Sequence, residues 1–454
     1  MKHLNTITVL LILLGCATGS CKKMIEAKPP VNEITSEAAF KDSAGTVAAL
    51  LNIYSQFGAT GGSIEGYYSP YPSLYADELE PTSAGSNDYE YYTNSVSINN
   101  ATNAACWSRL YYVIYECNAL LKGITGSPAL TGSFISKTGG EAKFLRAFSY
   151  FLLVNYYGDV PLVLSTDVTV TASLARNTQA VIYKQILQDL TDATGELGVD
   201  YPSAEKVRAN KWAAEALLAK VNLYTGNWKD AEAASDLVLN SGIYTPLEEP
   251  ANVFLANSKE TILQFEEKYG YSWSGIYFQP FYGSVEFSIT PGLLQAYESN
   301  DLRRKEWIDS VIDNGIVLYY PAKYRNSNFN MVNSAEYTMC LRVAEQYLIR
   351  AEARCHEDKT ADAVADVNIV RNRAAIDPVS AGISKDSCLN LIEEERKREL
   401  FTEWGNRFFD LKRTGKADMV LGTAKANWKS SDSLLPVPQI ELNNNPSLIQ
   451  NQGY

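Results

Sequence analysis

The fold class follows from two neighbouring stretches, KWAAEALLAKVNLY at residues 211–224 and WKDAEAASDLV at residues 228–238. In both stretches the apolar residues recur at three- and four-residue steps, which predicts two amphipathic helices. Gly226 separates them and suits the end of a helix, and the alanines lie where two helices must approach closely. The sequence therefore predicts a helical hairpin at this place.

A second hairpin of the same character is predicted further along the chain. Residues 343–353 and 361–369 have helical periodicity, and a turn is expected between them at residues 356–359. Hairpins of this kind resemble tetratricopeptide repeats, which stack their apolar faces and leave an outer surface for partners. The same periodicity predicts helices over residues 36–57, 104–124, 140–157, 178–197, 208–224, 228–240, 290–297, 337–355, 361–374 and 388–404.

Two stretches interrupt the helical pattern. Residues 60–100 are rich in Gly, Ser, Pro, Asn and Tyr, and residues 269–289 begin with a run rich in Gly and aromatic residues. Such compositions predict long loops or short strands, and a long loop in a compact domain usually has a function. We therefore expect a mostly α fold, a tetratricopeptide-like helical-repeat superhelix with an irregular, loop-rich ligand-binding region.

Composition and motifs narrow the possible functions. The 454 residues are 46% apolar and 20% charged, which is ordinary for a globular protein, and the net charge of -12 without a basic run makes nucleic acid an unexpected partner. Histidine occurs only as His3 and His356, and no nucleophile elbow, phosphate loop or zinc peptidase motif is present. We therefore expect no catalytic residues, no cofactor and no metal.

The N-terminus has the features of a bacterial lipoprotein signal. Lys2 and His3 precede an apolar run at residues 4–14, and small residues then lead to Cys16 and Cys21. The run has about 11 residues, whereas a membrane-spanning helix needs roughly 20. We predict a signal peptide over residues 1–20, lipidation at Cys21 and a tether over residues 21–34; lipidation at Cys16 and ordinary secretory cleavage remain alternatives.

The remaining cysteines fit neither a zinc site nor a disulfide framework, because they are odd in number and irregularly spaced. Cys340 and Cys355 fall in a predicted helix and are expected to be small buried residues. A disulfide between Cys106 and Cys117 remains open.

Short motifs in a fixed order carry a family resemblance. They are SCKKMIE (20–26), WSRLYYVIYECN (107–118), EAKFLRAFSYF (141–151), YGDVP (157–161), the hairpin at 211–226, RVAEQYL (342–348), EERKREL (394–400), GNRFFDL (405–411) and NQGY (451–454). Together they resemble the SusD/RagB-type nutrient-binding lipoproteins of the outer membrane. The resemblance implies one SusD-like domain over residues 35–454, lipid-anchored and facing the cell exterior, with a SusC-like TonB-dependent transporter as partner.

The charged residues of these motifs lie in apolar helical surroundings. We predict that they form buried ion pairs between helices rather than a catalytic site. The residues concerned are Arg146, Glu345, Arg396, Glu399, Arg407 and Asp410.

The candidate ligand-binding residues are mainly aromatic. Sugars present apolar C–H faces ringed by hydroxyl groups, so a sugar site needs flat rings together with amide or carboxyl groups. The two loop-like stretches offer both, and we predict the ligand-binding residues Asp77, Tyr89, Tyr91, Tyr92, Asn94, Trp273, Tyr277 and Tyr282. Family members that bind glycans carry two aromatic residues one residue apart with an Asn three further on, and Tyr89, Tyr91 and Asn94 resemble that pattern. Packing of these rings onto the helices is the alternative; for Tyr67–Tyr75 packing is preferred.

The expected function is that of a non-catalytic surface lipoprotein that binds an oligosaccharide and delivers it to its transporter. Three alternatives remain at this point. One is an oligopeptide binder of the same family, the second a tetratricopeptide-like envelope scaffold, and the third a carboxylate-dependent hydrolase that would use Asp77, Glu78 and Glu80.

Overall fold

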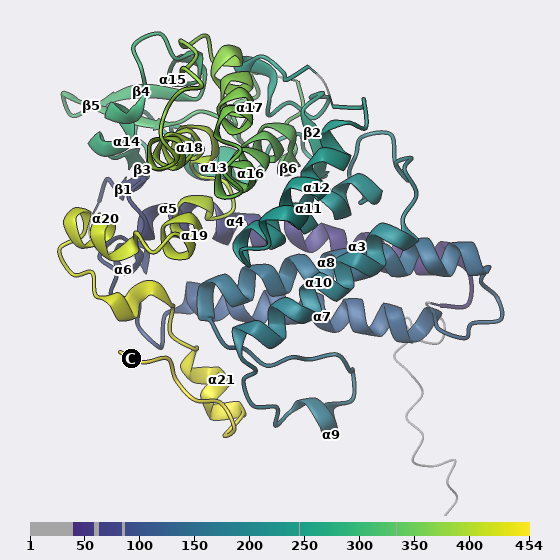
Figure 1. The fold of residues 1–454 in the computed structure, drawn as a ribbon. Helices are drawn as coiled ribbons and strands as arrows, with labels where there is room; N and C mark the ends of the chain where they lie inside the picture. The colour runs from purple at the N-terminus through teal and green to yellow at the C-terminus, as the bar shows by residue number, and fades with distance from the viewer. Residues whose placement is uncertain (1–39, 59–62, 84–86, 245, 333) are drawn as a thin grey trace, which may run out of the picture.

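Long helices dominate the first half of the chain in the computed structural model, which describes residues 40–58, 63–83, 87–244, 246–332 and 334–454 (Figure 1). They are α3 (Ser43–Gly58), α7 (Ala101–Ile124), α8 (Gly132–Tyr157) and α10 (Gln179–Glu196). α8 packs against both α7 and α10, and α3 packs on α7 and α8. Almost every residue of α8 from Thr138 to Tyr157 is buried, so this helix is the centre of the core.

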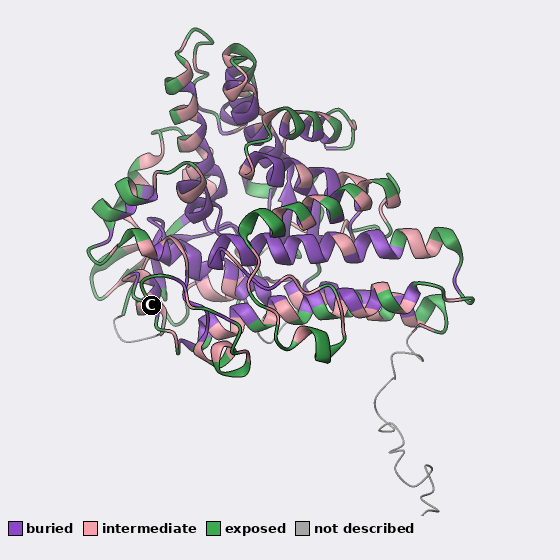
Figure 2. Ribbon diagram, turned by 60° about the horizontal axis from the view of Figure 1, so that its bottom comes forward, coloured by how far each residue is buried: buried purple, intermediate pink, exposed green. Residues whose placement is uncertain are grey.

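The second half continues the same packing. Its main helices are α11 (Lys211–Tyr224), α12 (Trp228–Leu239), α16 (Val343–His356), α17 (Thr360–Arg373), α18 (Lys385–Leu400), α19 (Asn406–Arg413), α20 (Ala417–Ala424) and α21 (Gln439–Asn444). α11 pairs with α12, α16 pairs with α17, and α12 packs on α16, so the two predicted hairpins lie next to each other. Figure 2 shows that buried residues run along these helices and exposed ones along their outer faces. The predicted mostly α fold is confirmed.

Local sequence explains where the helices begin and end. Asn100, Thr131 and Asn210 stand just before α7, α8 and α11, and each side chain accepts a hydrogen bond from a backbone N–H in the first turn. α8 ends at Tyr157 because Gly158 adopts a positive φ of 72°, which an L side chain rarely takes. The predicted stop at this position is confirmed.

Three small antiparallel sheets lie beside the helices. Their strands are β1 (Leu79–Pro81) with β3 (Phe287–Ile289), β2 (Thr261–Phe265) with β6 (Thr338–Arg342), and β4 (Ile308–Asp313) with β5 (Ile316–Pro321). The predicted helix over residues 337–355 is wrong at its start, because β6 pairs with β2 there and Cys340 lies on a strand. All five residues of β6 are buried. In such a short run of buried residues, periodicity alone cannot distinguish a strand from a segment of helix.

The two loop-like stretches contain more regular structure than their composition predicted. Residues 60–100 include α4 (Ile64–Tyr68), α5 (Pro70–Tyr75), β1 and α6 (Asn87–Tyr92), and residues 269–289 include α13 (Trp273–Phe278) and β3. Helices of five or six residues are marginal by themselves, so packing on the rest of the fold must stabilise them. The other short helical segments are α9 (Val168–Thr171), η2 (Pro250–Asn252), α14 (Pro291–Ala296), α15 (Leu302–Glu306) and η3 (Ser430–Ser433).

The predicted buried ion pairs are confirmed. Arg146 on α8 donates to Asp189 on α10, with an Nη2 to Oδ1 distance of 2.7 Å. Glu399 accepts from Arg342 at 2.6 Å and from Arg303 at 2.8 Å, and the side chains of Glu399 and Arg303 have no exposed surface. The other predicted residues pair as Lys220–Glu345, Arg396–Asp410 and Arg407–Asp77.

The cysteines within the described residues are all free and buried. Cys106 and Cys117 both lie on α7, 11 residues apart. At the rise of an α-helix this spacing places them about 16 Å apart along the helix axis. The open possibility of a disulfide between them is therefore excluded. Cys16, Cys21, the predicted signal peptide and the predicted tether lie outside the described residues.

Candidate functional site

The fold brings the two predicted loop stretches together. α13 packs on α4 at Gly66, where an added Cβ would lie 3.4 Å from Cγ of Trp273 and 3.5 Å from Cε2 of Tyr277. β1 pairs with β3, and the backbone N–H of Thr82 donates to the carbonyl of Glu286 at 3.0 Å. Side chains about 200 residues apart in the sequence therefore share one region, which sequence spacing alone could not show.

Partly exposed rings gather in this region. The ring centroids of Trp273 and Tyr277 are 5.8 Å apart, and those of Tyr67 and Tyr71 are 6.3 Å apart. The guanidinium of Arg109 on α7 lies 5.7 Å from the centroid of Tyr67, within the range of a cation–π contact. Tyr67, Trp273 and Tyr277 are each half-buried, so their rings are fixed by packing while part of each stays open to solvent.

Two carboxyl groups stand beside these rings. Burial, the charge of Asp88 and a hydrogen bond with Asp88 together raise the pKa of Glu286 to about 7. Burial, and then the charge of Glu286, raises the pKa of Tyr277 to about 12. Asp88 on α6 and Glu286 before β3 thus share a hydrogen bond, and both carboxyl groups lie near enough to Tyr277 on α13 to affect its pKa. The sequence analysis missed both carboxyl groups, although Asp88 immediately precedes Tyr89.

The predicted residues that remain accessible are Tyr89, Tyr92, Trp273, Tyr277 and Tyr282. Tyr89 is 40% exposed and its ring centroid lies 6.0 Å from that of Tyr92, one helical turn further along α6. Lys425 Nζ lies 4.1 Å from the centroid of the half-buried Tyr92. We define the loop surface as Tyr67, Asp88, Tyr89, Trp273, Tyr277, Tyr282 and Glu286.

Tyr282 is the most exposed large side chain of this surface. It is 94% exposed and stands with Gly283 in a two-residue turn, in which the backbones of Phe281 and Ser284 bond to each other in both directions. The φ angles of Tyr282 and Gly283 are 49° and 83°, as in a type I′ turn, whose first position normally carries Asn, Asp or Gly. The Phe281 ring lies 4.2 Å from that of Tyr282 and 4.4 Å from that of Phe329.

Three predicted ligand-binding residues are instead part of the interior. Tyr91 is 1% exposed and packs on Tyr71 at 4.9 Å, because residues two apart on α6 point to different sides of the helix. Asn94 is 4% exposed and donates to the carbonyl of Tyr75 at 2.9 Å. These two predictions are corrected: both side chains hold α5 and α6 together. The packing role preferred for Tyr67–Tyr75 is confirmed for Tyr68, Tyr71 and Tyr75, which are buried, but only in part for Tyr67, which is half-buried.

Asp77 is likewise corrected. Its carboxylate accepts from Arg407 at 2.8 Å and from Lys397 at 3.2 Å. Burial alone would raise its pKa, but these two cations hold the pKa of Asp77 well below its ordinary value. The neighbouring Glu78 is 2% exposed, and burial raises its pKa to about 7. Both carboxyl groups make interior contacts in this structure, and neither belongs to the loop surface.

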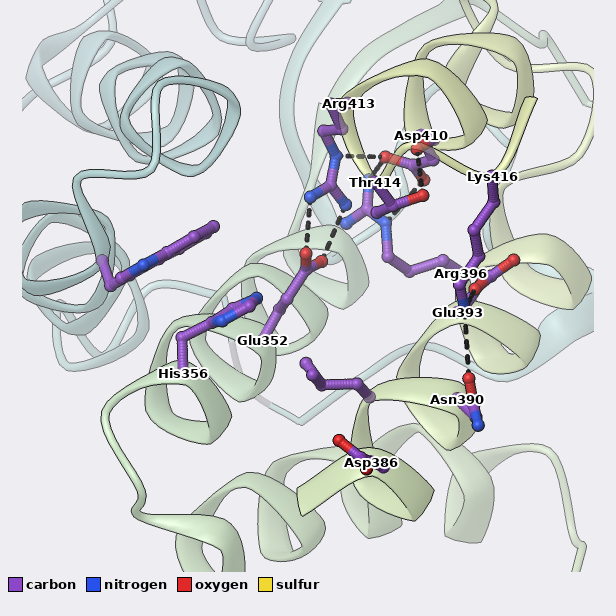
Figure 3. Close-up of a pocket in the computed structure, with 12 residues that line it drawn as sticks. Glu352, His356, Asp386, Asn390, Glu393, Arg396, Asp410, Arg413, Thr414 and Lys416 are labelled. Atoms are coloured by element: carbon purple, nitrogen blue, oxygen red, sulfur yellow. Dashed lines mark hydrogen bonds and ion pairs between the residues drawn. The ribbon is translucent and has the colours of Figure 1, made fainter. Parts of the chain in front are cut away.

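A cavity of about 540 Å³ lies elsewhere, among α12, α16, α18 and α19 (Figure 3). No predicted ligand-binding residue lines it. Within the described parts of the chain, no three His, Cys, Asp or Glu side chains are placed to hold a metal ion. No helix among the described ranges is both long enough and apolar enough to cross a membrane.

Comparison with known proteins identifies the family. A family model described as starch-binding and associating with the outer membrane matches residues 31–223, and the model of the SusD family matches residues 309–454. SusD-like protein P25 from Formosa agariphila is 26% identical over all of both chains. The starch-binding protein SusD from Bacteroides thetaiotaomicron is 30% identical over 131 residues, which are 25% of this chain and 21% of that protein.

Solved structures share the fold. A SusD superfamily protein from Bacteroides vulgatus superposes with a TM-score of 0.81 at 22% identity, covering 91% of this chain and 100% of that one. A laminarin-binding SusD-like protein gives a TM-score of 0.76 at 24% identity, covering 91% of this chain and 99% of that one. The two family models match the two ends of the chain, and the full-length relative and the shared fold agree with the order of the motifs. The chain therefore belongs to the SusD family.

Proposed function

We propose that this protein is a non-catalytic glycan-binding lipoprotein of the cell surface, which captures an oligosaccharide and delivers it to a SusC-like TonB-dependent transporter of the outer membrane. The ligand binds on the loop surface. The aromatic rings of the loop surface stack on the C–H faces of the sugar, and the carboxyl groups of Asp88 and Glu286 accept hydrogen bonds from its hydroxyl groups.

The observation that carries the proposal is Tyr282. A bulky residue at positive φ is uncommon and costs conformational energy. With 94% of its surface exposed, the ring recovers little of that energy by burial within the chain. Contact with a molecule outside the chain explains why an aromatic residue occupies the tip of this turn.

The names of relatives support the choice of a glycan. One relative is called a starch-binding protein, and solved structures that share the fold are called a laminarin-binding protein and a surface glycan-binding protein. An array that carries starch and laminarin oligosaccharides beside a tripeptide library tests the choice directly. Saturable binding to glycans supports it, and binding to peptides alone would make the protein an oligopeptide binder.

Lipid anchoring at Cys21 is a separate part of the proposal, supported by the signal motif. Changing Cys21 to Ser should move the protein from the membrane fraction to the soluble fraction, while Cys16→Ser should leave it membrane-bound. The reverse result would place the lipid on Cys16. Delivery to a transporter predicts that affinity capture from detergent-solubilised outer membranes recovers a large barrel protein, and a monomer without such a companion would contradict it.

A further inference from the structure

The cavity of about 540 Å³ in the helical repeats has the size of a small-ligand site. Trp228 at the start of α12 and His356 at the end of α16 form one wall, with ring centroids 3.9 Å apart and planes inclined by 9°. α18 supplies Asp386, Leu389 and Asn390. Four helices therefore build the cavity, and none of them carries a residue of the loop surface.

The charges deep in the cavity neutralise one another (Figure 3). Arg413 donates two hydrogen bonds to Glu352, one of them at 2.7 Å from Nη2, and a third to Asp410 at 2.8 Å. Arg396 donates to Asp410 at 2.7 Å, and Lys416 pairs with Glu393. Three cations thus balance three of the four carboxylates that line the cavity.

Four hydrogen-bonding groups of the cavity wall remain for a ligand, and two of them, His356 and Asn390, are uncharged. Burial lowers the pKa of His356, so its ring is neutral at pH 7. Asn390 accepts from Lys416 through Oδ1, which leaves its amide N–H₂ as a donor. Arg396 Nη1 is buried and has no hydrogen-bond partner among the described residues. Asp386 is exposed and forms no ion pair within the described part of the chain.

Apart from the exposed Asp386, the charges that line the cavity are paired. Paired charges, aromatic and aliphatic walls, and both donors and acceptors suit a neutral polyhydroxyl ring better than an anion. We propose that this cavity is a second saccharide site, which holds one or two neutral sugar units independently of the loop surface. The assignment of sugars as its ligand class rests on the proposed function, whereas the existence and independence of the site rest on the cavity.

His356 makes the site measurable, because it is the only histidine after His3. The mature chain, purified without a histidine tag and labelled with ¹⁵N-histidine, gives ring signals from one residue at the cavity wall. Maltose and laminaribiose are titrated to 50 mM. The proposal predicts a saturable shift of the His356 signals with at least one disaccharide, and a lower pKa of His356 in its presence because the sugar covers the ring.

Matched variants locate the response. Asp386 and Asp362 are exposed aspartates in the first turns of α18 and α17, but only Asp386 lines the cavity. Asp386→Asn should weaken the response at least fivefold, and Asp362→Asn should leave it unchanged. Tyr282→Ala should also leave it unchanged.

Three results would overturn the second site. One is an absent or unsaturable response to both disaccharides, the second is a response that Tyr282→Ala removes, and the third is a response only to N-acetyl-lysine methylamide, which would indicate a pocket for basic side chains. Failure of the proposed function looks different, since the glycan array would then be negative or insensitive to Tyr282→Ala while His356 still responds.

Discussion

The helical repeats and the loop surface hold their side chains in opposite ways. In the repeats, each long helix packs on two or more neighbours, and charged residues such as Glu399 are fully enclosed and paired. On the loop surface, short helices fix one side of each ring and leave the other side to solvent, up to 94% for Tyr282. The difference predicts that changes in the repeats reduce stability, whereas changes on the loop surface reduce binding.

The largest effect is expected for Glu399→Gln. This change removes a charge that neutralises Arg303 and Arg342 in the interior, and breaking a buried ion pair costs roughly 3 to 5 kcal/mol of folding free energy. Glu394→Gln, at an exposed position of the same helix, is the matched control and should cost almost nothing. Chemical denaturation compares them, and equal stabilities would contradict the structural role of the network.

Tyr91 and Tyr89 allow a buried ring and an exposed ring to be compared within one short helix, α6. Tyr91→Ala should lower the free energy of unfolding by about 3 to 5 kcal/mol, because the ring is buried against Tyr71 and Tyr75. Tyr89→Ala, two residues earlier and 40% exposed, should change it by less than about 1 kcal/mol. Thermal melts of both variants measure the difference, and a stable Tyr91→Ala protein would mean that α6 is placed differently.

Glu267, at the boundary between the two regions, should make the folding stability depend on pH. Burial, and then the charge of Glu65 on α4, raises the pKa of Glu267 to about 9. With a pKa of about 9 the carboxyl of Glu267 is protonated in the folded chain at neutral pH, whereas in the unfolded chain it ionises near pH 4.5, so stability falls as pH rises from about 4.5 to 9. Glu267→Gln should remove this fall, at most about 1.4 kcal/mol per pH unit. Denaturation midpoints at pH 6, 7 and 8 test it, and parallel pH profiles of the two proteins would refute the raised pKa.

The sequence predicted the long helices because their apolar periodicity extends over many turns, as in α7, α8 and α11. It did not predict β6, since five consecutive buried residues suit a strand and a helix equally well. Tyr91 was assigned to the ligand because the burial of its ring depends on α6, a helix of six residues that only tertiary packing stabilises. Asp88 and Glu286 were missed because their contact joins two loops that only the folded chain brings together.

The most direct test of the account is calorimetric titration of Tyr282→Ala with the glycan identified on the array, beside Tyr115→Ala on the exposed face of α7 as control. The ring of Tyr282 is almost fully exposed, so its removal should leave the melting temperature unchanged within about 2 °C. By analogy with stacking of bases on aromatic rings, it should weaken glycan binding by about 1 to 3 kcal/mol. Full affinity in the Tyr282→Ala protein, or an equal loss in Tyr115→Ala, would contradict the assignment of the loop surface as the ligand site.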